Sequence, residues 1–312
     1  MIRIFLLLLF LTGLPIAGFS CDFCNNLNGV NPHYTGKNLI ALNWLVQHSE
    51  LDAVAGSPST GFSKIAHGGH GTTATGYQES RQTLDLTILW HLSPSWMVQA
   101  NLPWQANRLD SDGITTSRWV GDMGIMTKYV ISNPASGGWY RYLIVGGGLE
   151  LPTGNNHLKD GSGQRLPMDL QIGSGSTDLL ASLLWIDQWD TWTVASDWYL
   201  KYSTKNRDDY QVGSSLTTAA SVAHDLWRNN SLSLAAVGMT GLRFEKAGAD
   251  ADSGSRVKGT GSSTLFLQAT MKIYYQSLRW YATALVPTWT SRPSGSPAEH
   301  TRLATGISWE WE

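Results

Sequence analysis

The amino-acid sequence predicts an all-β fold, a transmembrane up-and-down antiparallel β-barrel of about 12 strands. Three observations lead to this prediction. Apolar and polar residues alternate with a period of two along most of the chain, as they do when successive side chains of a strand point to opposite faces. Long polar connections alternate with short ones along the chain, which is typical of outer-membrane barrels with long extracellular loops and short periplasmic turns. Tryptophans flank both kinds of connection, and indole rings favour the lipid–water interface.

The composition narrows the possible functions. Only 15% of the 312 residues are charged and the net charge is −2, so electrostatics give no case for a nucleic-acid partner. The chain holds 15 tryptophans and 32 glycines, and both excesses in an alternating sequence indicate a barrel with aromatic girdles. The lipid bilayer of the outer membrane is the expected partner, and a soluble all-β protein is the alternative.

The first residues, 1–20, are expected to be a signal peptide. Arg3 precedes the apolar run 4–11, and a mostly small end at Ser20 offers a cleavage site. The run is shorter than the roughly 18 residues that a membrane span needs, so a retained anchor is the weaker interpretation. We therefore expect an exported protein with a periplasmic segment at 21–37 and an outer-membrane barrel at 38–312. Lipid attachment at Cys21 stays open.

Cys21 and Cys24 are the only cysteines and form a Cys-x-x-Cys pair. In an exported protein such a pair most often becomes a disulfide. Free thiols without a function, or a redox or metal role with His33 nearby, are the alternatives. Haem attachment is not expected, because Asn25 stands where the haem motif requires histidine.

Residues 81–104 give the clearest hairpin. Its apolar side chains share one face, and Asp85, Thr87, Gln99 and Asn101 share the other. The polar turn 93–95, which contains Pro94, joins the two strands and is expected on the periplasmic side. The apolar face of this hairpin is therefore predicted to meet lipid.

The same alternation predicts the other strands in order. They are expected within 38–48, 121–131, 139–152, 176–186, 192–202, 216–222, 232–242, 265–273, 280–286 and 303–311. The long connections are expected at 49–80, 105–119, 153–175, 204–211, 245–261 and 290–300. An even number of strands places both ends of the barrel in the periplasm.

Three segments resemble one known family. They are GDMGIMTKY at 121–129, LELPTGN at 149–155 and GSGSTDLLASLLW at 173–185. Together they resemble the outer-membrane β-barrel transporters grouped as the phenol-degradation MetA-pathway family. The resemblance implies a barrel for passage or binding of small compounds, hydrophobic or aromatic ones among them, and it supplies no catalytic residues. The chain departs from the usual barrel ending, an aromatic residue read by the barrel-assembly machinery, because Glu312 follows Trp311.

If the apolar faces meet lipid, a set of polar side chains points into the lumen. These candidates are Asp85, Lys128, Glu150, Asp178, Asp197, Lys201, Gln268 and Lys272. Ionisable groups in such a place pair with one another or line water. Their mixed signs favour a network across the lumen or a weakly selective pore. The alternative is simple packing of a narrow interior, because about eight strands fill with side chains and about sixteen leave a channel.

Histidines offer weak candidates for metal binding or catalysis. His67 and His70, with His48, would hold a first-row metal weakly without further ligands, so we expect no metal and no cofactor. His91 and His224 are the best bases for an outer-membrane hydrolase, but the sequence lacks a Gly-x-Ser-x-Gly motif. We therefore expect no enzyme.

The sequence thus predicts an outer-membrane channel or transporter for small compounds that it does not name. A structural, adhesive or ligand-binding barrel without transport is the alternative. The sequence leaves open whether a loop enters the lumen and whether barrels pair.

Overall fold

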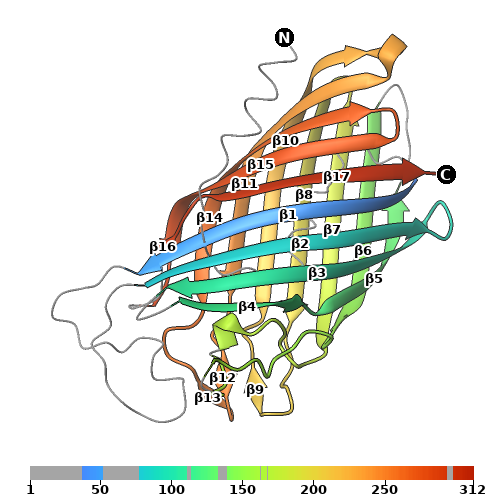
Figure 1. Cartoon of the computed structure of the whole chain (residues 1–312). Helices are drawn as coiled ribbons and strands as arrows, with labels where there is room; N and C mark the ends of the chain where they lie inside the picture. The colour runs from blue at the N-terminus through green and yellow to red at the C-terminus, as the bar shows by residue number, and fades with distance from the viewer. Residues whose placement is uncertain are drawn as a thin grey trace.

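The structure is a computed structural model that describes residues 37–51, 77–110, 114–132, 139–161, 163–166, 168–293 and 298–312. Within these residues the chain forms a closed antiparallel β-barrel (Figure 1). The expected signal peptide, the segment 21–36, Cys21, Cys24, His67 and His70 lie outside the described residues.

Long strands make the wall, and each pairs with the next one along the chain. They are β1 (Asn38–Leu51), β2 (Tyr77–His91), β3 (Trp96–Asp110), β5 (Met123–Ser132), β6 (Trp139–Leu151), β7 (Asp178–Trp189), β8 (Trp192–Tyr202), β10 (Ser215–Asn229), β11 (Leu234–Ala247), β14 (Ser262–Tyr275), β15 (Leu278–Ser291) and β17 (Arg302–Trp311). β4 (Ile114–Val120) also pairs with β3 and continues into β5 as one wall strand, and β16 (Ala298–Glu299) pairs with the end of β1.

The barrel closes between its first and last strands. β1 pairs with β2 on one side and with β17 on the other, and Asn38 lies opposite Trp311. The wall therefore has twelve strands and both of its chain ends lie at the end of the short turns, as an even strand count requires. The predicted up-and-down barrel is confirmed.

The two faces of the wall have opposite chemistry. In the hairpin of β2 and β3, Leu84, Trp90 and Trp104 are exposed on the outer face, whereas Asp85 and Asn101 are buried on the inner face. This pattern reverses that of a soluble protein, whose large apolar side chains are inside. It is the pattern of a barrel that meets lipid on its outside.

Tryptophans lie exposed near both ends of the wall. Trp96, Trp139 and Trp189 lie beside short turns, and Trp104 and Trp119 lie toward the long loops. The rings of Trp139 and Trp189 have centroids 6.2 Å apart on neighbouring strands. The outer face thus carries an aromatic rim at each end, where indole rings favour the bilayer interface.

Several strands extend further toward the loops than the alternation predicts. β2 already begins at Tyr77, and the stretch 105–119, predicted as a loop, holds the end of β3 and most of β4. The predicted loop 245–261 holds the end of β11 and a small hairpin of β12 (Ala251–Asp252) and β13 (Ser255–Arg256). Beyond the hydrocarbon layer both faces of a strand meet water. The strands therefore continue to pair through their backbones, although their sequences no longer alternate between apolar and polar residues.

Gly306 lets an inner-face contact cross β17. The Tyr281 hydroxyl, on β15, donates a hydrogen bond of 2.9 Å to Asn43 Oδ1 on β1. Gly306 lies between them, since it pairs with both residues across its two edges. A Cβ at position 306 would lie 2.5 Å from the Tyr281 ring and 2.6 Å from Asn43 Oδ1.

Gly306→Ala is expected to lower the free energy of unfolding by about 1–3 kcal/mol, because the added methyl overpacks this contact. A urea titration of the barrel in micelles, followed by tryptophan fluorescence, measures the change. Gly147→Ala is the matched control, since a Cβ there meets nothing within 4 Å. Equal stability of the two variants would contradict the proposed role of Gly306.

Candidate functional site

The inner face of the barrel has two bands of different chemistry. Toward the long loops and through the middle it is polar, with buried Gln47, Glu79, Arg81, Asp85, Asn101, Gln105, Glu150, Asp178, Lys201, Arg243, Gln268 and Arg302, which we call the polar band. Toward the short turns it is mixed, with apolar clusters beside charged side chains that include Lys128, Lys272 and Glu310. There Met97, Val130 and Ile144 pack with Leu89, Tyr142 and Leu184, and Ala223, Val237 and Met239 pack with Tyr274. We call these two clusters the apolar band.

Lys201 lies between two buried carboxylates in the polar band. Its ammonium contacts Glu150 Oε1 and lies 3.3 Å from Asp178 Oδ2. Asp178 Oδ1 also accepts hydrogen bonds from Ser176 Oγ at 2.8 Å and from the Thr204 backbone N–H at 2.9 Å. The three ionised groups come from the adjacent strands β6, β7 and β8, so they form one compact cluster with one excess negative charge.

A second polar cluster surrounds Asp85. Thr87 Oγ1 donates to Asp85 Oδ2 at 2.7 Å, and Asn101 Nδ2 donates to the same oxygen at 3.0 Å. Gln99 Nε2 donates to Asn101 Oδ1 at 2.8 Å, and Asn43 Nδ2 reaches Thr87 Oγ1 at 3.3 Å. This cluster joins β1, β2 and β3 through side chains on their shared inner face.

The remaining predicted lumen residues lie apart from these two clusters. Lys128 and Asp197 are half-buried and interact electrostatically, and the charge of Arg243 also acts on Asp197. Gln268 donates to Thr270 Oγ1 at 3.2 Å, and Lys272 is buried on the same face of β14. The structure therefore brings Glu150, Asp178 and Lys201 together in the polar band and distributes the other predicted residues around the wall.

Ion pairs near the loop end were missed by the sequence interpretation. Arg302 lies 2.8 Å from Glu245 and 2.7 Å from Glu299, and its guanidinium carbon is 4.6 Å from the Phe266 ring centroid. Arg243 Nε lies 2.5 Å from the same Glu245. Arg81 lies 3.4 Å from Glu79. The signal for Arg81 was present, because it precedes Asp85 by an even number of residues and so shares its face.

The three segments that carry the family resemblance meet at Asp122. Asp122 Oδ1 accepts the Gly154 N–H at 2.8 Å, and Oδ2 accepts the Ser174 N–H at 2.7 Å and the Ser174 hydroxyl at 2.8 Å. A Cβ on Gly154 would lie 2.7 Å from the Ile172 carbonyl oxygen, so the approach of the two loop arms requires glycine. We call Asp122, Gly154 and Ser174 the Asp122 clasp.

The clasp holds the loop 152–177 against the wall. Leu170, at the end of the 3-10 helix η3 (Met168–Leu170), and Ile172 are buried in it. Ser117 of β4 donates a hydrogen bond of 2.6 Å to the Leu170 carbonyl, and Ser117 itself is buried beside the inner-facing Asn107. This loop therefore packs on the inner side of β3 and β4 at the loop end, which the sequence left open.

Other loops join this one into a cap. β9 (Tyr210–Gln211) pairs with β12, and the two strands lie with β13 at the end of the barrel below β4 in Figure 1. Asn206 Nδ2 donates to the Ser174 carbonyl at 3.0 Å, and Arg165 lies 2.7 Å from Asp208. The Tyr210 hydroxyl donates to Asp250 at 2.6 Å. Burial raises the pKa of the Asp250 carboxyl, and the hydrogen bonds from Tyr210 and Gly213 oppose that rise.

The two histidines considered as bases both lie near short turns, on different strands. His224 stacks on Trp192 with ring centroids 4.2 Å apart. His91 is the last residue of β2, and its backbone N–H donates to Asn38 Oδ1 at 2.8 Å. The described residues contain no group of three or more histidine, cysteine or acidic side chains that could hold a metal ion.

None of the helices in the described residues is long and apolar enough to cross a membrane.

A closed antiparallel barrel with an apolar exterior and a polar interior defines the class of outer-membrane β-barrel proteins. The chain is similar in fold to the COG4313 outer membrane channel from Pseudomonas putida F1, with a TM-score of 0.63, 13% identity, and coverage of 89% of this chain and 97% of that one. A weaker likeness, with a TM-score of 0.49 and 10% identity, is to the β domain of the Bordetella autotransporter BrkA, over 88% of this chain and 100% of that one. No family model and no curated protein sequence matches the chain. At these identities the likeness shows the fold alone.

Proposed function

We propose that the protein is an outer-membrane channel for small compounds, hydrophobic or aromatic ones among them, and that it is not an enzyme. The two apolar clusters of the apolar band, on an inner face that is otherwise polar, carry this proposal. A solute with a polar group and a ring would meet hydrogen-bonding groups at the loop end and packed apolar side chains at the short-turn end. Binding sites for small molecules combine these two features, apolar lining with a few placed polar groups.

The motif resemblance supports the same function. The segments that resemble the phenol-degradation MetA-pathway family supply Asp122 and Gly154 of the clasp, Ser174, Glu150 and Asp178. The motifs thus coincide with the contacts that shape the loop end of the inner face. The fold likeness to a channel from Pseudomonas putida is consistent with this assignment.

A barrel without transport is the second candidate, and one observation favours it. Asp178 and Glu150 are 0% and 1% exposed, so the polar band is packed closely around its charges. With twelve wall strands, the barrel is intermediate between barrels of about eight strands, which side chains fill, and barrels of about sixteen strands, which leave a wide channel.

Solute flux distinguishes the two candidates. Vesicles that contain the purified barrel are expected to take up labelled benzoate, at a pH where it is ionised and crosses lipid slowly, faster than empty vesicles. Vesicles with heat-denatured protein are the control for leakage. Equal uptake by all three preparations would contradict the transport proposal and favour the barrel without transport.

A further inference from the structure

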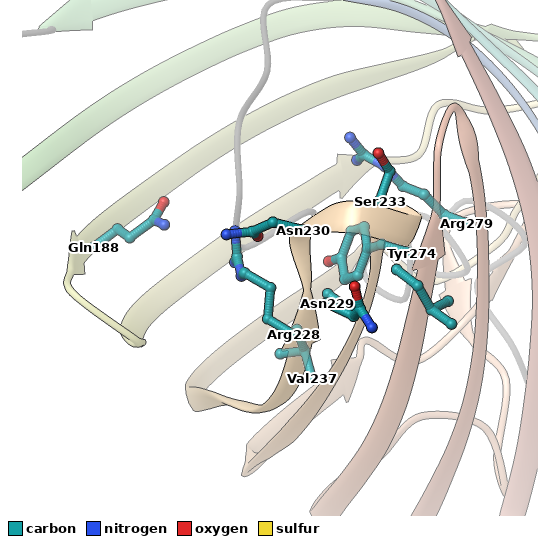
Figure 2. Close-up of a pocket in the computed structure, with 10 residues that line it drawn as sticks. Gln188, Arg228, Asn229, Asn230, Ser233, Val237, Tyr274 and Arg279 are labelled. Atoms are coloured by element: carbon teal, nitrogen blue, oxygen red, sulfur yellow. The ribbon is translucent and has the colours of Figure 1, made fainter.

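A cavity of about 370 Å³ opens inside the wall at the short-turn end, away from the polar band. Its lining comes from the ends of three hairpins (Figure 2). Gln188 lies at the end of β7, and Tyr274 and Arg279 lie around the turn between β14 and β15. The turn between β10 and β11 contributes Arg228, Asn229, Asn230, Ser233, Leu234, Ala235 and Val237. The 3-10 helix η4 (Asn230–Leu232) forms part of this turn and is capped by the Asn229 side chain. The volume falls in the range of small-molecule sites, roughly 300–1,000 Å³.

The floor of the cavity is apolar and aromatic. Val237 is 1% exposed and packs with Tyr274 in the apolar band, and Ala235 pairs directly with Tyr274 across the two strands. Leu234 adds a further apolar wall. An aromatic ring could therefore pack against the Tyr274 ring, in the offset or edge geometry that such pairs prefer.

Two arginines lie at the rim of the cavity, and a carboxylate balances the charge of each. Arg279 contacts Glu310, and its guanidinium carbon lies 5.3 Å from the Tyr274 ring centroid. Arg228 Nε donates to Asp225 Oδ2 at 3.1 Å. Because each guanidinium has a carboxylate partner, the site does not select for several negative charges. Its polar atoms suit one oxygen substituent on an otherwise apolar ligand.

We propose that this cavity is a binding site for a small aromatic compound with a single hydroxyl or carboxylate group, with its ring against Tyr274 and its oxygen at the arginine rim. The role of this cavity as the place where a solute leaves the barrel rests on the proposed function. As a binding site it can be measured without transport, so a failure of flux and a failure of binding are separate results.

Saturation-transfer NMR of the purified barrel in micelles, with phenol and benzoate as probes, tests the site, because single-ring ligands have too few atoms for tight binding. Tyr274→Leu keeps an apolar side chain but removes the ring, and is expected to weaken binding of both probes by about tenfold, which corresponds to one aromatic contact. Tyr275→Leu is the matched control, because Tyr275 is the next residue and is exposed on the outer face.

Cyclohexanol, which has the size of phenol without its ring electrons, is expected to bind more weakly than phenol. Filling the cavity with Ala235→Trp is expected to abolish the signal of both probes. If Tyr274→Leu binds phenol as wild type does, or if cyclohexanol binds as well as phenol, the aromatic site is overturned. A wild-type barrel that binds both probes but shows no benzoate flux would keep the site and remove only its role in exit.

Discussion

Replacing Lys201 by methionine is expected to lower the free energy of unfolding of the barrel by about 3–5 kcal/mol, because it leaves the buried carboxylates of Glu150 and Asp178 side by side without their shared cation. Denaturation of the barrel in micelles by urea, followed by tryptophan fluorescence, measures the loss. A methionine has nearly the length of the lysine stem, so the change removes the charge and leaves most of the packing.

Matched variants separate this effect from a general cost of losing lysine. Lys258→Met removes a charge from an exposed loop position and is expected to leave stability unchanged. Adding Glu150→Gln and Asp178→Asn to Lys201→Met removes the repulsion and is expected to recover much of the loss. If Lys201→Met alone is as stable as wild type, the three groups are not the tight buried cluster that the structure shows.

Asp122→Ala is expected to release the loop 152–177 from the wall. It removes a buried acceptor of three hydrogen bonds, and each bond to a charged group contributes about 1.5–3 kcal/mol. The substitution lowers the free energy needed to open the loop and leaves that of unfolding the barrel nearly unchanged, because the backbone hydrogen bonds between the strands stay in place. The loss of only one such bond, about 2.7 kcal/mol, already raises the open fraction about a hundredfold.

Limited trypsin digestion at Lys159 and Arg165, both in this loop, reports the open fraction, because cleavage of a transiently opened segment follows its equilibrium population. Cleavage of Asp122→Ala is expected to be at least about a hundredfold faster than that of wild type, with the barrel itself intact. Asp252→Asn, at an exposed position in β12, is the control and should be cut at the wild-type rate. Equal cleavage of Asp122→Ala and wild type would show that other contacts hold the loop.

The alternation in the sequence predicts which face each side chain takes, but it does not predict which side chains meet. Asp85 and Lys201 were both expected on the inner face, and that expectation needs only a period of two. The approach of Lys201 to Glu150 depends on the pairing register across β6, β7 and β8, and register is a property of the folded sheet.

The loop contacts could not be predicted from the sequence for a different reason. Asp122 bonds residues 32 and 52 positions further along the chain, through a backbone path with no repeating pattern. Arg302 and Glu245 lie in stretches where the strands leave the membrane and apolar alternation fades. The apolar band was missed because side chains such as Val130 share the inner face with polar ones. The candidates for the inner face were chosen by their polarity, so this choice left the apolar residues out.

Conductance of the purified protein in planar bilayers measures directly whether the barrel holds a path for small solutes. Discrete current steps are expected, with weak ion selectivity because the polar band carries charges of both signs. A bilayer that stays silent with correctly folded protein would contradict the channel and leave a barrel whose inner face is packed shut.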